Sequence, residues 1–129
     1  MSDKEFFEKV RARPGLYGLR ASYWNAYMSL IGFNEARAGG CLRGFTEWLT
    51  VRKGECTSFG WQALVLEEAF PDMEPTGLNK LDILNPEQEE HAVDLLLSLL
   101  LEFLADRDDP TRLAHMYVRY EALHQPGIQ

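Results

Sequence analysis

The side chains of this sequence that could do chemistry are three histidines, two cysteines and twenty carboxylates. His91 follows Glu87 by four positions, so one helical turn could bring the imidazole and the carboxylate together. His115 and His124 lie further along the chain, and they match neither the ligand spacings of zinc sites nor the paired Glu-x-x-His units of di-iron bundles. The spacing predicts no metal site and no cofactor, and we interpret His91 as a surface residue.

Cys41 and Cys56 form neither a Cys-x-x-Cys pair nor a cluster with histidine. The sequence also contains no Gly-x-Ser-x-Gly elbow for a nucleophilic serine. A disulfide between the two cysteines is not expected, because thiols stay reduced in the cytoplasm. We therefore predict a cytoplasmic protein that is not an enzyme and has no catalytic residues.

Polar residues recur at every fourth position of one apolar segment. Glu90, Asp94, Ser98, Glu102 and Asp106 form this series, four of them carboxylates, and in a helix they would lie in one narrow strip that meets water. Like charges at this spacing cost roughly 0.2–0.5 kcal/mol per pair. The only positive residues close to the strip in sequence are two arginines, at positions 107 and 112.

Two interpretations of this acidic strip remain open. It could be a solvated face that keeps the protein soluble. It could also be a docking surface for a basic partner, which the shortage of nearby positive residues favours. The candidate partner-binding residues are the carboxylates of the strip and its continuation, together with a second group beside a proline-rich loop: Glu87, Glu90, Asp94, Glu102, Asp106, Asp108, Glu67, Glu68, Asp72 and Glu74.

The charge of the chain is divided unevenly. Residues 1–54 carry nine Lys/Arg and five Asp/Glu, a net charge of +4, whereas residues 55–129 carry four and fifteen, a net charge of −11. The basic residues near the amino terminus lie among aromatic ones, a composition that can suggest nucleic-acid binding. The total of −7 repels phosphate, however, so we predict no nucleic-acid partner.

Helical signals dominate the elements that must position these residues. Asn85-Pro86 is a strong helix start, and the segment that follows, about 86–106, is apolar on nearly every side. We expect this helix to be covered by its neighbours at the centre of the protein. The prediction is an all-α, single compact domain, 1–129, of about six helices.

The other helices follow from caps and breakers. Ser2 and Ser22 are N-cap candidates for helices ending near Arg13 and Arg37, and Asp109-Pro110 starts a last helix to about residue 123. Two more are expected over about 42–52 and from Thr57 or Ser58 to residue 69. A short link should make the helices over 22–37 and 42–52 an antiparallel pair.

Three details of packing complete the structural expectations. Gly15, after Pro14, is expected at the positive-φ position of a type II turn. Trp24, Trp48 and Trp61 each lie in an apolar helical pattern, so all three are predicted to be core residues. Segments 51–56 and 81–84 are the places where a strand is conceivable.

No membrane contact is predicted. The longest apolar-rich run, from Leu95 to Leu101, is far shorter than the about 20 residues that span a bilayer. The charged amino terminus also has no apolar stretch of the signal-peptide type.

The segment from Glu8 to Gly18, which contains Arg13-Pro14-Gly15-Leu16-Tyr17, resembles a short Arg-Pro-Gly-Met-Tyr segment in the ATPase domain of type II topoisomerase subunits. That ATP site also needs an Asp-x-Gly-x-Gly loop, and the sequence contains none. Nucleotide hydrolysis is therefore not predicted, and we interpret the segment as a helix stop followed by a turn.

In size, acidity and expected helical content, the chain resembles the immunity proteins of bacterial toxin systems that are delivered by contact or by type VI secretion. The resemblance concerns overall character and no single motif. It implies a non-catalytic inhibitor that occludes the active site of a cognate toxin, whose basic surface would bind the carboxylates.

Two alternatives belong to other functional classes. The chain could be a small ligand-binding domain or enzyme whose site is assembled from distant residues, with Trp48, Trp61, His91 and Tyr117 as pocket members. It could also be a homodimeric adaptor, which an exposed apolar patch larger than about 400 Å² would reveal.

Overall fold

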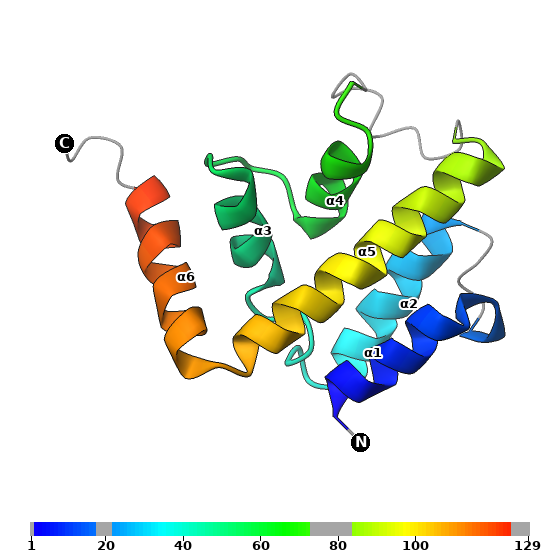
Figure 1. The fold of residues 1–129 in the computed structure, drawn as a ribbon, viewed down its shortest axis with the longest axis horizontal. Helices are drawn as coiled ribbons and strands as arrows, with labels where there is room; N and C mark the ends of the chain where they lie inside the picture. The colour runs from blue at the N-terminus through cyan, green and yellow to red at the C-terminus, as the bar shows by residue number, and fades with distance from the viewer. Residues whose placement is uncertain (1, 18–21, 73–83, 125–129) are drawn as a thin grey trace.

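A computed structural model describes residues 2–17, 22–72 and 84–124 of the chain (Figure 1). These residues form a short 3₁₀ helix and six α-helices, and no strand occurs among them, which confirms the all-α prediction. The elements in chain order are α1 (Asp3–Ala12), η1 (Pro14–Tyr17), α2 (Tyr23–Ala36), α3 (Phe45–Lys53), α4 (Trp61–Ala69), α5 (Pro86–Arg107) and α6 (Pro110–Leu123).

The start of α5 is encoded locally. The Asn85 side chain accepts a hydrogen bond from the backbone N–H of Gln88 (2.8 Å), and the Gln88 side chain accepts one from the N–H of Asn85 (2.9 Å). Pro86 occupies the first helical position, where no intrahelical N–H bond is lost. The predicted start at Asn85-Pro86 is confirmed.

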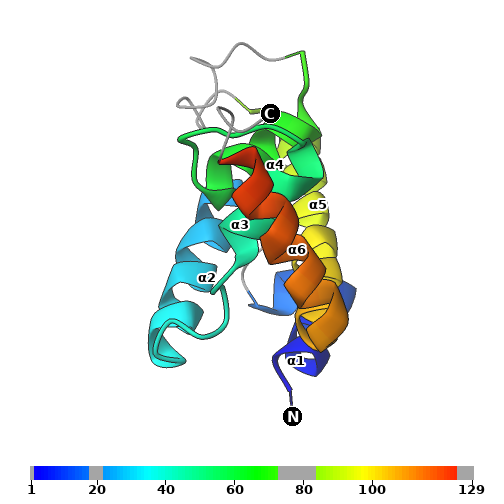
Figure 2. The same cartoon turned by 90° about the vertical axis from the view of Figure 1, so that its left-hand side faces the viewer.

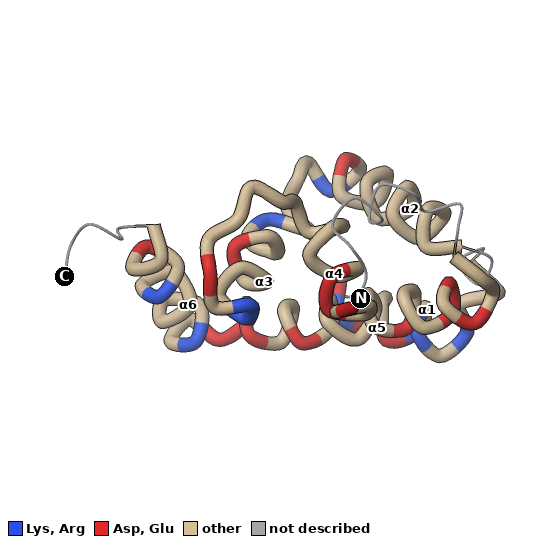
Figure 3. Tube along the Cα trace, turned by 90° about the horizontal axis from the view of Figure 1, so that it is seen from above, with Lys and Arg blue, Asp and Glu red and all other residues tan. Residues whose placement is uncertain are grey.

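The prediction that α5 lies at the centre is also confirmed, since α5 contacts every other α-helix. Figures 2 and 3 show α1 beside α5 on one side of the molecule, with α2, α3 and α4 on the other and α6 at one end. The buried side chains of α5 are Ala92, Val93, Leu96, Leu97, Leu99, Leu100, Phe103 and Leu104.

Aromatic side chains fill the space between α5 and the opposite layer. The ring of Phe45 lies 5.3 Å from that of Phe103 and 5.8 Å from that of Trp61, and all three side chains are buried. Such pairs stabilise a core beyond the area that they bury, by about 0.5–1.5 kcal/mol each. The aromatic cluster therefore fixes α3 and α4 against α5.

Tyr23 ties α2 to two other helices. Its side chain is fully buried, and its hydroxyl donates a hydrogen bond to the carbonyl of Gln62 on α4 (2.8 Å). Burial raises the pKa of Tyr23 far above the usual range. Its backbone N–H, in the first turn of α2, donates to the carboxylate of Glu89 on α5, while Ser22 accepts from the N–H of Asn25 (2.9 Å). Two side chains, one local and one distant, thus satisfy N–H groups at the start of α2.

The prediction of three core tryptophans was wrong for Trp24. Trp61 is buried and Trp48 is half-buried, but the Trp24 side chain is 52% exposed. The buried face of α2 is formed by Tyr23, Ala26 and Leu30. Residues 23–34 carry no charge, as Figure 3 shows, so the sequence pattern did not distinguish the inner face from the outer one.

The expected antiparallel pair of α2 and α3 was also wrong. α3 packs mainly on α6 and α4, whereas α2 packs on α5. The connection between them changes direction several times, since Ala38, Gly39 and Gly44 have positive φ angles of 56°, 77° and 91°. The carbonyl of the Asn34 side chain also accepts a hydrogen bond from the N–H of Leu42 (2.8 Å), which redirects the chain.

Two local predictions need correction. Gly15 has no positive φ, because Pro14 to Tyr17 form a 3₁₀ turn in which the N–H of Leu16 donates to the carbonyl of Arg13 (3.1 Å). Gly60, and neither Thr57 nor Ser58, is the N-cap of α4, because the Thr57 hydroxyl instead accepts from the N–H of Phe59 (3.2 Å).

Segment 51–56 continues α3 and then turns, so it is not a strand, while most of segment 81–84 lies outside the described residues. No helix in the described part of the chain combines the length and the apolar character needed to cross a bilayer.

Phe103→Ala should lower the free energy of unfolding by about 3–5 kcal/mol, because it removes a fully buried ring of α5 that packs on Phe45 of α3. Urea unfolding followed by circular dichroism measures the change. Val118→Ala, at a side chain that is 69% exposed on α6, is the control and should stay within about 0.5 kcal/mol of the wild type. Equal loss in the two variants would contradict the proposed core.

Candidate functional site

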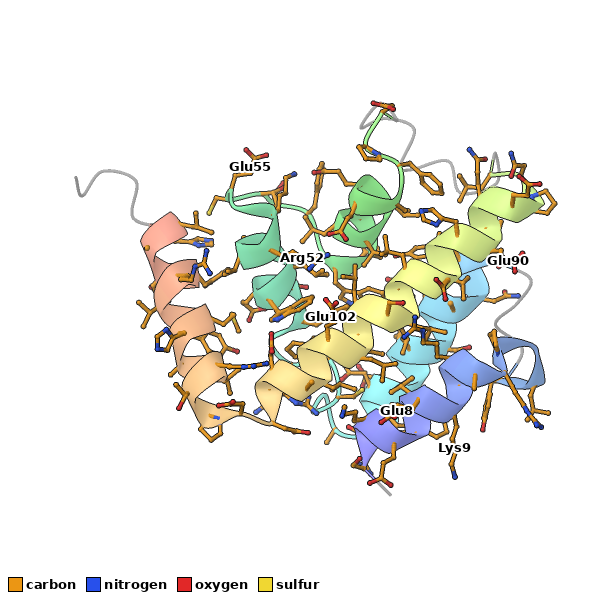
Figure 4. The ribbon with its side chains drawn as sticks, in the orientation of Figure 1. Glu8, Lys9, Arg52, Glu55, Glu90 and Glu102 are labelled. Carbon is orange, nitrogen blue, oxygen red and sulfur yellow. The ribbon has the colours of Figure 1, made fainter. Side chains whose placement is uncertain are left out.

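The strip of carboxylates on α5 meets water over most of its length. Glu90, Asp94 and Glu102 are exposed, whereas Ser98 and Asp106 are half-buried. Figure 4 shows Glu102 near Arg52 of α3 and Glu90 toward the amino-terminal end of α5. The predicted solvent-facing strip is therefore confirmed for three of its five members.

The expected shortage of positive charge around this strip was wrong at its carboxyl-terminal half. Arg52 of α3 makes a two-pronged bond to Glu68 of α4, with N–O distances of 2.8 and 3.1 Å, and lies 3.5 Å from Glu102. The hydrogen bond that Arg52 donates to Glu68 raises the pKa of Arg52. Arg52 lies 50 positions from Glu102 in sequence, so the pair forms only through the fold.

Asp106 is held by two partners. One carboxylate oxygen accepts a hydrogen bond from the indole N–H of Trp48 (2.9 Å), and the other lies 3.2 Å from the guanidinium of Arg112. An external ligand of Asp106 would therefore compete with partners inside the chain for the position of both oxygens. Asp106 therefore acts first as a connector between α3, α5 and α6.

The second predicted group, beside the proline-rich loop, is also largely compensated. Lys53 forms ion pairs with Glu67 and, at 3.5 Å, with Glu55, and the hydrogen bond to Glu67 raises the pKa of Lys53. Asp72 is exposed, and Glu74 lies outside the described residues.

Three carboxylates on the amino-terminal half of α5, Glu87, Glu90 and Asp94, remain as an acidic edge. All three are exposed; within the described residues Glu87 and Glu90 have no ion pair, and Asp94 only approaches Arg11 at 3.9 Å. A cavity of about 130 Å³ lies beside the edge, between Pro14 and Glu90. Asp108 is also exposed, but it lies beyond the other end of α5.

A groove between α3 and α6 was not predicted. It is an open groove of about 570 Å³, and we call it the arginine groove because Arg52, Arg112 and Arg119 line it together with Trp48, Val51, Asp106, Thr111, His115 and Met116. On α6, residues 112, 115, 116 and 119 have the spacing of one helical face. That spacing is the sequence signal that could have revealed half of the groove.

The pocket residues considered for a ligand-binding domain do not converge. Trp48 lines the arginine groove, but Trp61 is buried in the core. His91 is exposed and its ring lies 5.8 Å from that of Phe70, while Tyr117 borders a different cavity beside Gly40. Among the described residues, no group of three His, Cys, Asp or Glu side chains could hold a metal ion.

The two cysteines are free thiols in different surroundings. Cys41 is buried, and its burial together with the nearby Asp3 raises the pKa of its thiol to about 11. Cys56 is exposed. The two side chains therefore differ in access, and Cys41 also has little thiolate at neutral pH.

No family model, curated protein or solved structure matches this chain. Its function must be inferred from the acidic edge and the arginine groove, which lie toward opposite ends of α5. Since α5 has 22 residues, its ends are about 33 Å apart. The two surfaces can therefore bind different molecules.

An alkylating reagent at about pH 8 should modify Cys56 rapidly and Cys41 only after unfolding, because the reactive species is an accessible thiolate. Peptide mass mapping of native and urea-treated protein measures both sites. Equal labelling of the two cysteines in the native protein would show that Cys41 is not enclosed.

Asp106→Ala should lower the free energy of unfolding by about 1–2 kcal/mol, because it leaves the indole N–H of Trp48 without its acceptor. The indole proton of Trp48 should also exchange faster with solvent, which NMR detects. Asp108→Ala, at an exposed neighbour, is the matched control and should change neither quantity. An unchanged indole exchange rate in Asp106→Ala would rule out the connector role.

Proposed function

We propose that this chain is a non-catalytic protein-binding inhibitor, and specifically an immunity protein that neutralises a cognate bacterial toxin by occluding its active site. The observation that carries the proposal is the acidic edge of Glu87, Glu90 and Asp94. These carboxylates are exposed and, apart from the long contact of Asp94 with Arg11, have no ion pair in the described part of the chain. A toxin that cleaves nucleic acid needs a basic surface around its active site, which is complementary to this edge.

The position of the acidic edge favours binding. It lies on the helix that packs on the largest number of neighbours, so the backbone positions from which its carboxylates project are fixed before the partner arrives. Preorganisation of this kind reduces the entropy lost on association. The net charge of −7 adds a long-range field that accelerates encounter with a basic protein.

Apolar side chains next to the acidic edge could supply the apolar contact area that carboxylates alone do not provide. Pro14 lines the same small cavity as Glu90 and Asp94, and Leu16 is 72% exposed two residues later. Tyr17 is 38% exposed, and its ring packs on that of Phe6 at 5.7 Å. An exposed apolar residue beside a charged rim is the usual composition of a binding hot spot.

The other candidate carboxylates have a smaller part in this proposal. Glu67, Glu68, Glu102 and Asp106 already form ion pairs within the chain, so a partner would have to compete with Lys53, Arg52 or Arg112 for them. Breaking such pairs offsets part of the energy gained on binding. The proposed interface is therefore centred on the amino-terminal half of α5.

Glu90→Lys/Asp94→Lys should weaken binding to the toxin encoded by the adjacent reading frame by about tenfold or more, since both charges change from attraction to repulsion. Titration calorimetry at low salt measures the dissociation constant. The control is Glu55→Lys/Glu121→Lys, which makes the same change of net charge at exposed residues outside the acidic edge and should alter affinity less than about threefold.

Growth assays test the biological part of the proposal. Cells that express the toxin should survive with the wild-type chain and with the control variant, but not with Glu90→Lys/Asp94→Lys. Full resistance to the toxin in cells that lack this gene would refute an immunity function. Equal affinity of both double variants would refute the acidic edge as the interface.

A further inference from the structure

We propose that the arginine groove binds a small aromatic compound that carries a phosphate or carboxylate group. This binding site is independent of the proposed toxin interface, because it lies between α3 and α6 at the other end of α5. Its volume of about 570 Å³ falls in the range of about 300–1,000 Å³ that is typical of small-molecule sites.

The side chains that line the groove include more positive than negative charges, unlike the protein as a whole. Arg52, Arg112 and Arg119 line it with a single carboxylate among the described residues, Asp106, and His115 lies on the same face of α6, whereas the chain has a net charge of −7. Arg52 and Arg112 form ion pairs with carboxylates of the chain, so the charge left for an anion is mainly that of Arg119. Arginine binds phosphate and carboxylate groups with two parallel N–H donors. The groove is therefore suited to an anion, although most of the surface repels one.

Arg119 is the guanidinium best placed to receive the anion. Arg52 and Arg112 are engaged by Glu68 and by Asp106 and Asp109. Arg119 has no ion pair with any residue that the structure describes, and it is exposed at the groove. Its donors can form new bonds without breaking existing ones, which favours binding at this end of the groove.

The wall of the groove is rigid. Asp106 fixes the indole of Trp48 through a 2.9 Å bond and Arg112 through a 3.2 Å contact. The guanidinium of Arg52 lies 5.8 Å from the indole ring and is itself fixed by Glu68. These restraints hold the aromatic face and two positive charges in place, so little side-chain entropy is lost when a ligand binds.

The apolar side of the groove indicates an aromatic ligand. Trp48, Val51 and Met116 line it beside the charged groups, and the guanidinium of Arg52 lies 5.8 Å from the indole ring. An indole face and a thioether both pack favourably on aromatic rings. A bare inorganic anion would leave this apolar surface uncovered, whereas an aryl phosphate or aryl carboxylate would use both halves of the site.

Phenyl phosphate and benzoate are the two probes that separate the possible sources of the anion, with inorganic phosphate and phenol as controls. Two-dimensional NMR of the indole N–H groups follows binding, and Trp48→Phe assigns the signal of Trp48. Phenyl phosphate or benzoate should shift that signal in a saturable way. Inorganic phosphate should bind about tenfold more weakly, and phenol should not bind, since each lacks half of the recognition elements.

Arg119→Gln should weaken binding of the better probe by about tenfold, because it removes the guanidinium that has no internal ion pair. Arg13→Gln removes an equally exposed arginine from the distant end of α1 and should leave the affinity unchanged. Circular dichroism verifies that both variants fold. The proposal is overturned if neither aromatic anion shifts the Trp48 signal, or if the two arginine variants bind equally.

Discussion

The structure depends on the need to bury α5. Eight of its 22 residues are buried, and they lie on too much of its circumference for a single neighbouring helix to cover. Each fully buried leucine or phenylalanine contributes roughly 1.5–3 kcal/mol only if water is removed from its whole surface. The other five α-helices therefore all pack against α5, and the arrangement of the domain follows from this one requirement.

The same requirement decides where polar residues can lie on α5. Only a narrow strip reaches the surface, and four carboxylates and Ser98 occupy it at intervals of four residues. At the carboxyl-terminal half, arginines from α3 and α6 reach Glu102 and Asp106 and neutralise them. At the amino-terminal half, the only positive group near the carboxylates in the described part of the chain is Arg11, 3.9 Å from Asp94. The acidic edge therefore lies at one end of α5, and the arginine groove lies at the other.

The parts of this structure that the sequence predicts are those governed by neighbours along the chain. The caps at Ser2, Ser22, Asn85 and Asp109 are confirmed, since a cap needs only its own first turn. The apolar pattern of α5 likewise predicted its central position. The buried face of α2 was predicted wrongly, because large apolar residues lie on its outer side as well, and only Asn25, Ser29 and Glu35 mark that side as polar.

The functional surfaces were harder to predict, because ion pairs that cross the fold decide which charges remain available. Arg52 is 16 positions from Glu68 and 50 from Glu102, and no local pattern connects them. The strip on α5 was identified from its spacing, but its division into compensated and less compensated halves required the tertiary structure. The arginine groove is formed by α3 and α6. Only the helical spacing of its α6 residues could be recognised in the sequence.

The hydrogen bond between Glu89 and the backbone of Tyr23 has a consequence for the order of folding. It spans 66 positions, so the first turn of α2 gains this acceptor only after a large loop has closed. Both α5 and α2 have local N-caps, Asn85 and Ser22, but α2 also takes the acceptor for the N–H of Tyr23 from α5. The first turn of α2 is therefore completed only when α5 is in place, which couples the formation of the two helices.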